Sequence, residues 1–158
     1  MKLKDLLYKV SIVKVIGSVD MEVIDIQFDS RKIVSGSLFV AISGDITDGH
    51  KFIEETILRG ANVIVVEKVP QNINNSVTYI KVSNSNEALA IIASNFYNNP
   101  SEKIKLIGVT GTNGKTTIVS LLHQLFGFLN VESGMISTIH NKISNEIITS
   151  THTTPDAL

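Results

Sequence analysis

Apolar residues recur along this chain at two spacings, which together predict a succession of strands and helices. Runs rich in β-branched residues, the pattern of strands, occupy residues 23–28, 38–42, 61–66 and 77–82. Apolar residues at helical spacing occupy residues 2–9, 50–59 and 84–97. Gly60 is suited to end the second of these helices, and Asn84 followed by Glu87 is suited to begin the third. Because strands and helices alternate, the pattern predicts an α/β fold.

The Asn-Asn-Pro-Ser segment at residues 98–101 interrupts the helical pattern and is typical of a linker. We therefore expect two domains, residues 1–99 and residues 100–158. The second begins with an apolar strand at 104–109, followed by a helix that ends near 127–130.

A further strand at 131–137 is expected to lie parallel to the strand at 104–109, joined to it by a right-handed crossover. Residues 139–149 have the pattern of a short hairpin that turns at Ser144 and Asn145. A parallel sheet needs cover on both faces, yet residues 103–158 predict only one full helix. We therefore expect the beginning of a larger parallel-sheet domain, either truncated or covered by a partner.

The composition fits a globular protein with a core, since 43% of the residues are hydrophobic and 18% are charged. The net charge of −1 provides no basic field for nucleic acid. There are no cysteines, which excludes disulfides and thiolate metal sites and is compatible with the cytoplasm. Asp5, Lys9 and Lys14 interrupt any signal-peptide core. No apolar run approaches the ~18 residues that a membrane helix requires.

The loop between the strand at 104–109 and the following helix is suited to hold phosphate. Gly111 and Gly114 allow a tight turn whose N–H groups point inward, and a helix N-terminus favours an anion at the same place. Lys115 adds a full positive charge, and the Thr116 hydroxyl can bind a Mg²⁺ ion held by the phosphate. The alternative is an ordinary strand–turn–helix connection.

The loop departs from the general phosphate-loop pattern in one respect. That pattern has a glycine five residues before Gly114, where this chain has Val109, and Gly108 lies one position earlier. The loop therefore carries one extra residue. In this form, Thr-Gly-Thr-Asn-Gly-Lys-Thr-Thr at 110–117 resembles the ATP loop of the Mur ligase family, which joins amino acids to peptidoglycan precursors. Folylpolyglutamate synthetases look similar at this loop.

Two polar segments follow predicted strands in the first domain. Asp29-Ser30-Arg31 combines a carboxylate, a hydroxyl and a guanidinium, and arginine suits bidentate contacts to phosphate or carboxylate. The alternative for this segment is an Asp/Ser turn with a solvated arginine. The loop at 44–51 has two glycines and several polar tips, and an ordinary connection with His50 near a helix start is equally open.

Several longer segments extend the resemblance to almost the whole chain. Those resembling the N-terminal domain of Mur ligases are Asp-Ser-Arg at 29–31, Gly-Ser-Leu-Phe-Val-Ala-Ile-Ser-Gly at 36–44, Thr-Asp-Gly-His-Lys-Phe-Ile at 47–53 and Gly-Ala-Asn-Val-Ile-Val-Val at 60–66. The ending Thr-Thr-Pro-Asp-Ala-Leu at 153–158 is similar to the family type that adds the third residue of the peptide. The resemblance implies a small N-terminal α/β domain, then the beginning of a P-loop parallel-sheet domain.

The resemblance also implies roles for individual residues. The nucleotide end of UDP-MurNAc-L-Ala-D-Glu would contact Phe28, Ser30, Asp45, Ile46 and Thr47, and the muramoyl-peptide portion would contact Thr153 and Thr154. The ATP-binding residues would be Gly111, Thr112, Asn113, Gly114, Lys115, Thr116 and Thr117. Among these, Lys115 would be the catalytic residue that neutralises developing charge, and Thr116 would hold Mg²⁺.

The reaction implied by the resemblance is ATP-driven amide formation through an acyl phosphate on D-Glu, which the amine of a diamino acid then attacks. meso-Diaminopimelate is expected because it is common in the family, and L-lysine remains open. The expected partners are these small molecules alone, without nucleic acid or membrane insertion, and the full-length protein is expected to be a cytoplasmic monomer. The other metal ligands and the amino-acid-binding domain of the family are absent from residues 1–158, so this chain alone is expected to be inactive.

Three alternatives to this function remain. A small kinase or GTPase would need an acidic residue after an apolar strand, and the segment 131–137 offers only Glu132, near its beginning. The chain could instead be a non-catalytic module that binds a UDP-sugar. A Mur-like ligase that adds a different residue is the third.

Overall fold

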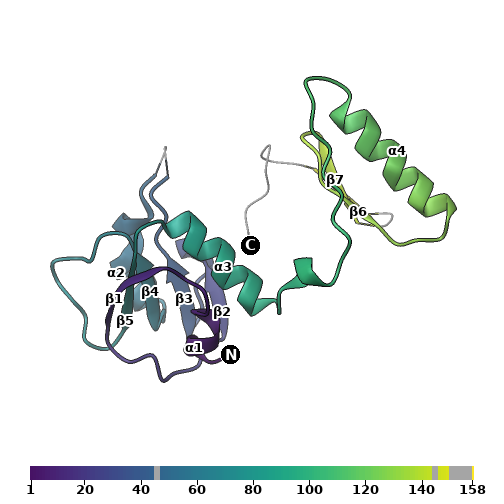
Figure 1. The fold of residues 1–158 in the computed structure, drawn as a ribbon. Coiled ribbons are helices and arrows are strands. Elements are labelled where there is room, and N and C mark those ends of the chain that lie inside the picture. The colour runs from purple at the N-terminus through teal and green to yellow at the C-terminus, as the bar shows by residue number, and fades with distance from the viewer. Residues whose placement is uncertain (45–46, 144–145, 150–157) are drawn as a thin grey trace. The chain divides into compact units, whose positions relative to one another are not determined.

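The structure, a computed structural model, describes residues 1–44, 47–143, 146–149 and 158. It divides into two compact units, one from Met1 to Ile104 and one that begins at Lys105. Figure 1 shows both. Each is described by itself below.

The first unit is built on a five-stranded sheet with the order β1-β5-β4-β3-β2. The strands are β1 (Ile12–Ile16), β2 (Asp25–Gln27), β3 (Ser37–Val40), β4 (Val63–Val66) and β5 (Thr78–Val82). β2, β3, β4 and β5 run parallel to one another, whereas β1 pairs antiparallel with β5 at the edge. The predicted α/β class is therefore confirmed, and all four predicted strands of this unit are present.

Helices cover both faces of this sheet (Figure 1). They are α1 (Leu3–Leu6), α2 (Ile53–Leu58) and α3 (Ser85–Phe96), with short 3₁₀ helices η1 (Ser30–Lys32), η2 (Gly49–Phe52) and η3 (Pro100–Glu102). Val63 and Val65 of β4 pack with α1 and α3, while Ile64 and Val66 pack on the side of α2. A strand buried on both faces has to be apolar at every position, which explains the continuous run in β4.

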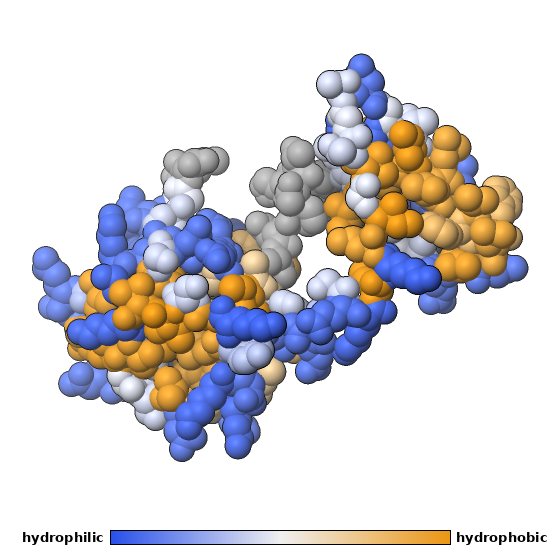
Figure 2. Space-filling model, viewed as in Figure 1, coloured by the Kyte–Doolittle hydropathy of each residue, from blue (hydrophilic) through white to orange (hydrophobic). Residues whose placement is uncertain are grey.

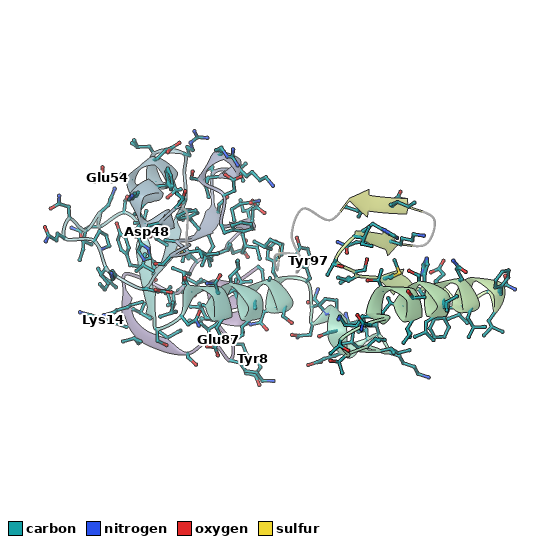
Figure 3. The ribbon with its side chains drawn as sticks, turned by 90° about the horizontal axis from the view of Figure 1, so that it is seen from above. Tyr8, Lys14, Asp48, Glu54, Glu87 and Tyr97 are labelled. Atoms are coloured by element: carbon teal, nitrogen blue, oxygen red, sulfur yellow. The ribbon has the colours of Figure 1, made fainter. Side chains whose placement is uncertain are left out.

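The predicted bounds of α3 are confirmed, including the cap at its start. The side chain of Asn84 accepts a hydrogen bond from the backbone N–H of Glu87 at 3.1 Å. Glu87 and Tyr97 mark the two ends of this helix in Figure 3. Gly60, at the end of α2, has a φ of +104°, which explains why a glycine stands there.

The edge strand β1 was not predicted from the sequence. Its residues are mostly exposed, its pairing with β5 shifts register between Ile12 and Lys14, and Lys14 interrupts its apolar pattern. An edge strand pairs on one side only, so its side chains are under weaker burial constraints than those of β4.

The second unit contains α4 (Lys115–Phe128) and an antiparallel sheet with the order β6-β7-β8. The strands are β6 (Gly134–Met135), β7 (His140–Ile143) and β8 (Glu146–Thr149). The predicted hairpin is confirmed by the pairing of β7 with β8, and its turn at 144–145 lies outside the described residues. The predicted end of the phosphate-loop helix is also confirmed.

Two predictions about the second unit are wrong. Residues 104–109 form no strand, and Leu106 is 83% exposed. The segment 131–137 contributes β6, which pairs antiparallel with β7 instead of parallel to 104–109. A parallel strand in a sheet needs neighbours and cover on its faces, and neither lies beside 104–109 among the described residues.

Apolar side chains gather on the surface of α4, as Figure 2 shows. Those at least about half exposed are Ile118, Leu121, Leu125 and Phe128. Met135 is the one buried hydrophobic residue that the structure describes after residue 104. The first unit therefore has a packed core, whereas the described part of the second has little. Among the described helices, none is long and apolar enough to cross a membrane.

Candidate functional site

The carboxyl ends of the four parallel strands lie along one side of the first unit's sheet, named here the carboxyl edge. η1 follows β2 there, and residues 41–48 follow β3. Glu67 follows β4, and the first turn of α3 follows β5. In open α/β sheets, ligands bind outside this edge. This edge therefore combines Phe28, Ser30 and Thr47, which were predicted to contact the nucleotide, with residues that the sequence did not single out.

Asp29 and Arg31 form an ion pair in the connection after β2. Asp29 accepts hydrogen bonds from the Nε and Nη2 atoms of Arg31 at 2.9 and 2.7 Å, and from its backbone N–H at 3.0 Å. The side-chain hydrogen bonds from Arg31, followed by the backbone bond, lower the pKa of Asp29 from 3.8 to about 2. The structure thus matches the alternative for this segment, an Asp turn with an exposed arginine, because the Arg31 guanidinium pairs with Asp29 within the segment and is 82% exposed.

Of the predicted substrate-contacting residues, Phe28 precedes this ion pair and Ser30 lies between its two members. Phe28 is partly buried against the core that contains α3, and Ser30 is the first residue of η1, partly exposed. The end of η1 is tied to α2, because Arg59 donates a hydrogen bond to the carbonyl of Arg31 at 3.3 Å. The backbone around Ser30 is therefore fixed by the Asp29–Arg31 pair and by the hydrogen bond from Arg59.

Residues 43–48 connect β3 to η2 and are named here the β3–η2 loop. Asp45 and Ile46 lie outside the described residues. Ser43 pairs with Asp48 as an antiparallel bridge, and the N–H of Gly44 donates to the carbonyl of Thr47 at 3.2 Å. A Cβ at Gly49 would lie 2.8 Å from the backbone nitrogen of Ile42, so a larger residue would displace the chain there.

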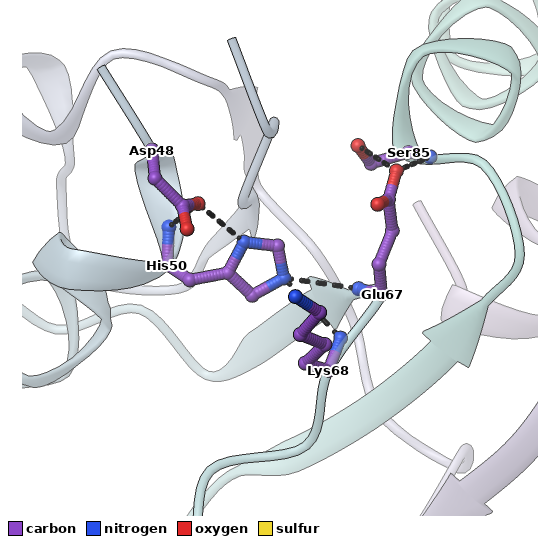
Figure 4. Close-up of polar contacts among 5 residues, drawn as sticks. All are labelled: Asp48, His50, Glu67, Lys68 and Ser85. Carbon is purple, nitrogen blue, oxygen red and sulfur yellow. Dashed lines mark hydrogen bonds and ion pairs between the residues drawn. The ribbon is translucent and has the colours of Figure 1, made fainter.

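His50 connects the β3–η2 loop to the end of β4 (Figure 4). Its Nδ1 lies 2.7 Å from Oδ1 of Asp48, which also accepts the backbone N–H of His50 at 3.0 Å. Its Nε2 lies 3.1 Å from the backbone nitrogen of Glu67 and 3.4 Å from that of Lys68. The backbone and side-chain hydrogen bonds from His50 lower the pKa of Asp48.

Glu67 in turn connects the end of β4 to the start of α3. Its Oε1 accepts from both the backbone N–H and the hydroxyl of Ser85, each at 2.8 Å. These bonds, the backbone bond first, lower the pKa of the Glu67 carboxyl. A helix N-terminus favours an anion, and here the protein's own carboxylate occupies that place.

The sequence places His50 in a polar loop near a helix start, and no pattern in it singles out Glu67 or Ser85. The Asp-Gly-His spacing at 48–50 was the one local signal available, since an Asp can accept the N–H two residues on. The partners of His50 and Glu67 lie 17 and 18 residues away, a separation at which no local pattern identifies a contact.

The second unit carries the predicted phosphate loop at the start of α4. Gly114 has a φ of +77° and Gly111 a φ of +151°, in the region that favours glycine. A Cβ on Gly114 would meet nothing within 4 Å, so the conformation and not crowding explains this glycine. The Nζ of Lys115 donates a hydrogen bond to the carbonyl of Gly111.

This loop fits a phosphate chain. The first N–H groups of α4 have no acceptor within the helix, and Thr112, Asn113, Lys115 and Thr117 are exposed, with Thr116 partly so. Among the described residues, no group of three or more His, Cys, Asp or Glu could hold a metal ion. If Mg²⁺ binds with the phosphate chain, Thr116 is the residue of this loop whose hydroxyl would be a ligand.

The remaining predicted site residues, Thr153 and Thr154, lie outside the described residues. The structure therefore brings together Phe28, Ser30 and the ends of the β3–η2 loop at one edge of the first unit. The phosphate loop belongs to the second unit.

Comparison with protein families gives two matches. The sequence profile described as "Mur ligase family, catalytic domain" matches residues 22–97. The profile described as "Mur ligase middle domain" matches residues 109–158. The two matches are consecutive and together cover most of the chain.

Two curated relatives of this chain carry the same name. The chain is 50% identical to the UDP-N-acetylmuramoyl-L-alanyl-D-glutamate--2,6-diaminopimelate ligase of Cytophaga hutchinsonii, over 100% of this chain and 33% of that protein. It is 45% identical to the protein of the same name from Bacteroides fragilis, again over 100% of this chain and 33% of the relative. The chain thus spans about a third of the length of the curated relatives it matches.

Solved structures share the fold. A UDP-N-acetylmuramoyl-L-alanyl-D-glutamate--2,6-diaminopimelate ligase matches 99% of this chain over 31% of its own, with a TM-score of 0.67 and 22% identity. The MurF ligase of Thermotoga maritima in complex with ADP matches 69% of this chain over 24% of its own, with a TM-score of 0.51 and 32% identity.

Proposed function

Because this chain belongs to the Mur ligase family, we propose that it provides the UDP-substrate-binding domain and the phosphate loop of an ATP-dependent amide ligase. The reaction we propose joins 2,6-diaminopimelate to UDP-MurNAc-L-Ala-D-Glu. The shared name of relatives at 45–50% identity supports this choice of diamino acid.

The observation that carries the proposal is the arrangement of two separate polar sites. Phe28 and Ser30 follow β2, and the β3–η2 loop with Thr47 follows β3, at the edge where α/β sheets bind ligands. We propose that these residues, with Asp45 and Ile46, contact the uridine diphosphate. Thr153 and Thr154 are proposed to contact the muramoyl peptide.

The second site is proposed for ATP, which when bound supplies the phosphoryl group that activates the substrate carboxylate. The backbone N–H groups at the start of α4 would hold the phosphates, and Lys115 would neutralise charge that develops on them. Thr116 is proposed as a ligand of Mg²⁺. The related MurF ligase was solved in complex with ADP, which supports an adenine nucleotide as the ligand.

We further propose that residues 1–99 and 100–158 belong to two domains of a cytoplasmic monomer, and that amide formation needs residues beyond these 158. The match to only a third of each curated relative supports the last point. A module that only binds the UDP-sugar is the second candidate, favoured by the better packed first unit.

Isothermal titration calorimetry with UDP-MurNAc-L-Ala-D-Glu and with ATP tests the proposal. We expect the 158-residue chain to bind the UDP substrate, to bind ATP weakly, and to form no amide from the two with diaminopimelate. Binding of the UDP substrate without any binding of ATP would favour the module. Absence of UDP-substrate binding would contradict both.

A further inference from the structure

The ring of His50 lies between two segments of the carboxyl edge and contacts both. The side chain is 13% exposed, whereas that of Asp48 is 45% exposed. Backbone N–H groups can only donate, so Nε2 of His50 must accept from Glu67 and Lys68. The proton of the neutral ring then resides on Nδ1 and is donated to Asp48. The partners of the ring thus fix its tautomer and its orientation.

Among the described residues, the β3–η2 loop also approaches the end of β4 at its first residue, where the side chain of Ser43 hydrogen-bonds to the Glu67 carboxylate. The N–H of Ala41 donates to the carbonyl of Val65 at 2.9 Å, the last rung between β3 and β4 in the described part of the chain. The bridge between Ser43 and Asp48 and the bond from Gly44 to Thr47 join the two sides of the loop to each other. His50 attaches the second side, at Asp48, to the backbone that follows β4.

The point of attachment on β4 is itself fixed. Glu67 accepts two hydrogen bonds from Ser85, which is fully buried at the start of α3. Asn84, the preceding residue, caps the same helix. The series Asp48–His50–Glu67–Ser85 therefore connects the β3–η2 loop, through the end of β4, to α3 (Figure 4).

We propose that His50 is a positioning residue for the UDP substrate: by accepting from the backbone of Glu67 and Lys68, it holds Thr47 and Asp48, the described end of the β3–η2 loop, where they bind the nucleotide. The inference rests on the proposed function, since that function assigns the loop to the uridine diphosphate. His50 acts through the loop and contacts no substrate itself.

Two amide substitutions separate the two halves of the ring. In His50→Gln, the longer side chain can place its amide oxygen where Nε2 accepts from β4. In His50→Asn, the shorter side chain can replace Nδ1 toward Asp48 but cannot reach β4. Lys51→Gln is the matched control, because Lys51 is exposed on the same 3₁₀ helix and lies outside the hydrogen-bond series.

The affinity of each 158-residue variant for UDP-MurNAc-L-Ala-D-Glu is the first measurement. We expect His50→Asn to raise the Kd about tenfold, the effect of losing a net hydrogen bond or two. His50→Gln should stay within about threefold of the unsubstituted chain, and Lys51→Gln should be unchanged. Glutamine is also closer to histidine in size than asparagine, so His50→Leu, which fills similar space but offers no acceptor to β4, is the control for packing. It should raise the Kd as His50→Asn does, and a His50→Leu variant that binds as tightly as the unsubstituted chain would overturn the proposal.

Amide hydrogen exchange is the second measurement and needs no ligand. The N–H groups of Glu67 and Lys68 should exchange faster in His50→Asn but not in His50→Gln, while those of Val63 to Val65 stay protected in both. Loss of protection throughout β4 in His50→Asn would overturn the proposal, because His50 would then support the sheet as a whole.

The affinities also separate failure of this inference from failure of the proposed function. If the unsubstituted chain binds the UDP substrate and His50→Asn binds it equally well, the positioning role of His50 is wrong and the proposed function stands. If the unsubstituted chain does not bind the UDP substrate, the proposed function is wrong and the role of the loop is wrong with it.

Discussion

The carboxylate of Asp29 accepts both hydrogen bonds of the Arg31 guanidinium, at 2.9 Å from Nε and 2.7 Å from Nη2. The pair spans Ser30, so it fixes the backbone on which the proposed substrate-binding hydroxyl stands. Arg31 itself is largely exposed and Asp29 is not.

Replacement of Arg31 by glutamine should raise the pKa of Asp29 from about 2 toward 3.8, because the side-chain hydrogen bonds of Arg31 are the main cause of the lowered value. A carboxyl group with a lowered folded-state pKa stabilises the fold above its unfolded pKa. That contribution is lost as the pH falls from about 4 through about 2. NMR titration of the Asp29 carboxyl carbon measures the pKa.

Lys32→Gln is the control for this titration, since Lys32 adds only the smallest of the lowering effects on Asp29. It should leave the pKa near 2. An unchanged pKa in Arg31→Gln would show that the ion pair does not form in solution.

Asn95→Ala should destabilise the first unit by about 1–3 kcal/mol, the cost of leaving buried acceptors unpaired. The side-chain amide of Asn95 donates to the carbonyls of Leu6 and Tyr8 at 2.9 and 2.8 Å, across 89 and 87 residues of sequence. Urea denaturation measures the change. Asn86→Ala, at an exposed position of the same helix, should change stability by less than about 0.5 kcal/mol.

Amide hydrogen exchange should differ between the two units. Val63 to Val66 are fully buried and should exchange slowly, whereas Leu106 and Ile107 are exposed and outside any strand and should exchange fast. Equally slow exchange in both segments would contradict the exposed, unpaired state of residues 104–109 in the structure and would indicate that this segment is paired in solution.

Lys115→Ala should weaken ATP binding at the phosphate loop and leave binding of the UDP substrate unchanged, because the two proposed sites lie in different units. A hydrogen bond to a charged group contributes about 1.5–3 kcal/mol, so the ATP affinity should fall about tenfold or more. NMR titration of the Gly111 to Thr117 amides detects weak binding. Lys105→Ala, at an exposed position before the loop, is the control.

Local patterns predicted the elements whose residues are constrained by burial or by capping. The fully buried β4 and the Asn84 cap of α3 are examples. The exposed strand β1 carries no such constraint and was missed. The segment 104–109 has a strand pattern because its residues are apolar, but a strand also requires a partner, which the segment's own residues do not specify.

The candidate site was predictable to the same extent. The phosphate loop is contiguous in sequence, so its glycines, Lys115 and helix were all visible. The contacts of His50 with Glu67 and of Glu67 with Ser85 arise only when β3, β4 and β5 lie side by side. These contacts depend on tertiary structure, so no pattern in the sequence reveals them.

The assignment of the carboxyl edge to the UDP substrate can be tested by titrating the 158-residue chain with UDP-MurNAc-L-Ala-D-Glu and following the amide chemical shifts by NMR. The titration is then repeated with Ser30→Ala. We predict shifts at the carboxyl edge, at Ser30, Thr47 and Lys68, with the phosphate-loop amides unmoved. Ser30→Ala should raise the Kd about tenfold or more, since a bond to a charged group is lost. Shifts centred elsewhere in the first unit, or an unchanged Kd, would contradict the assignment of this edge to the UDP substrate.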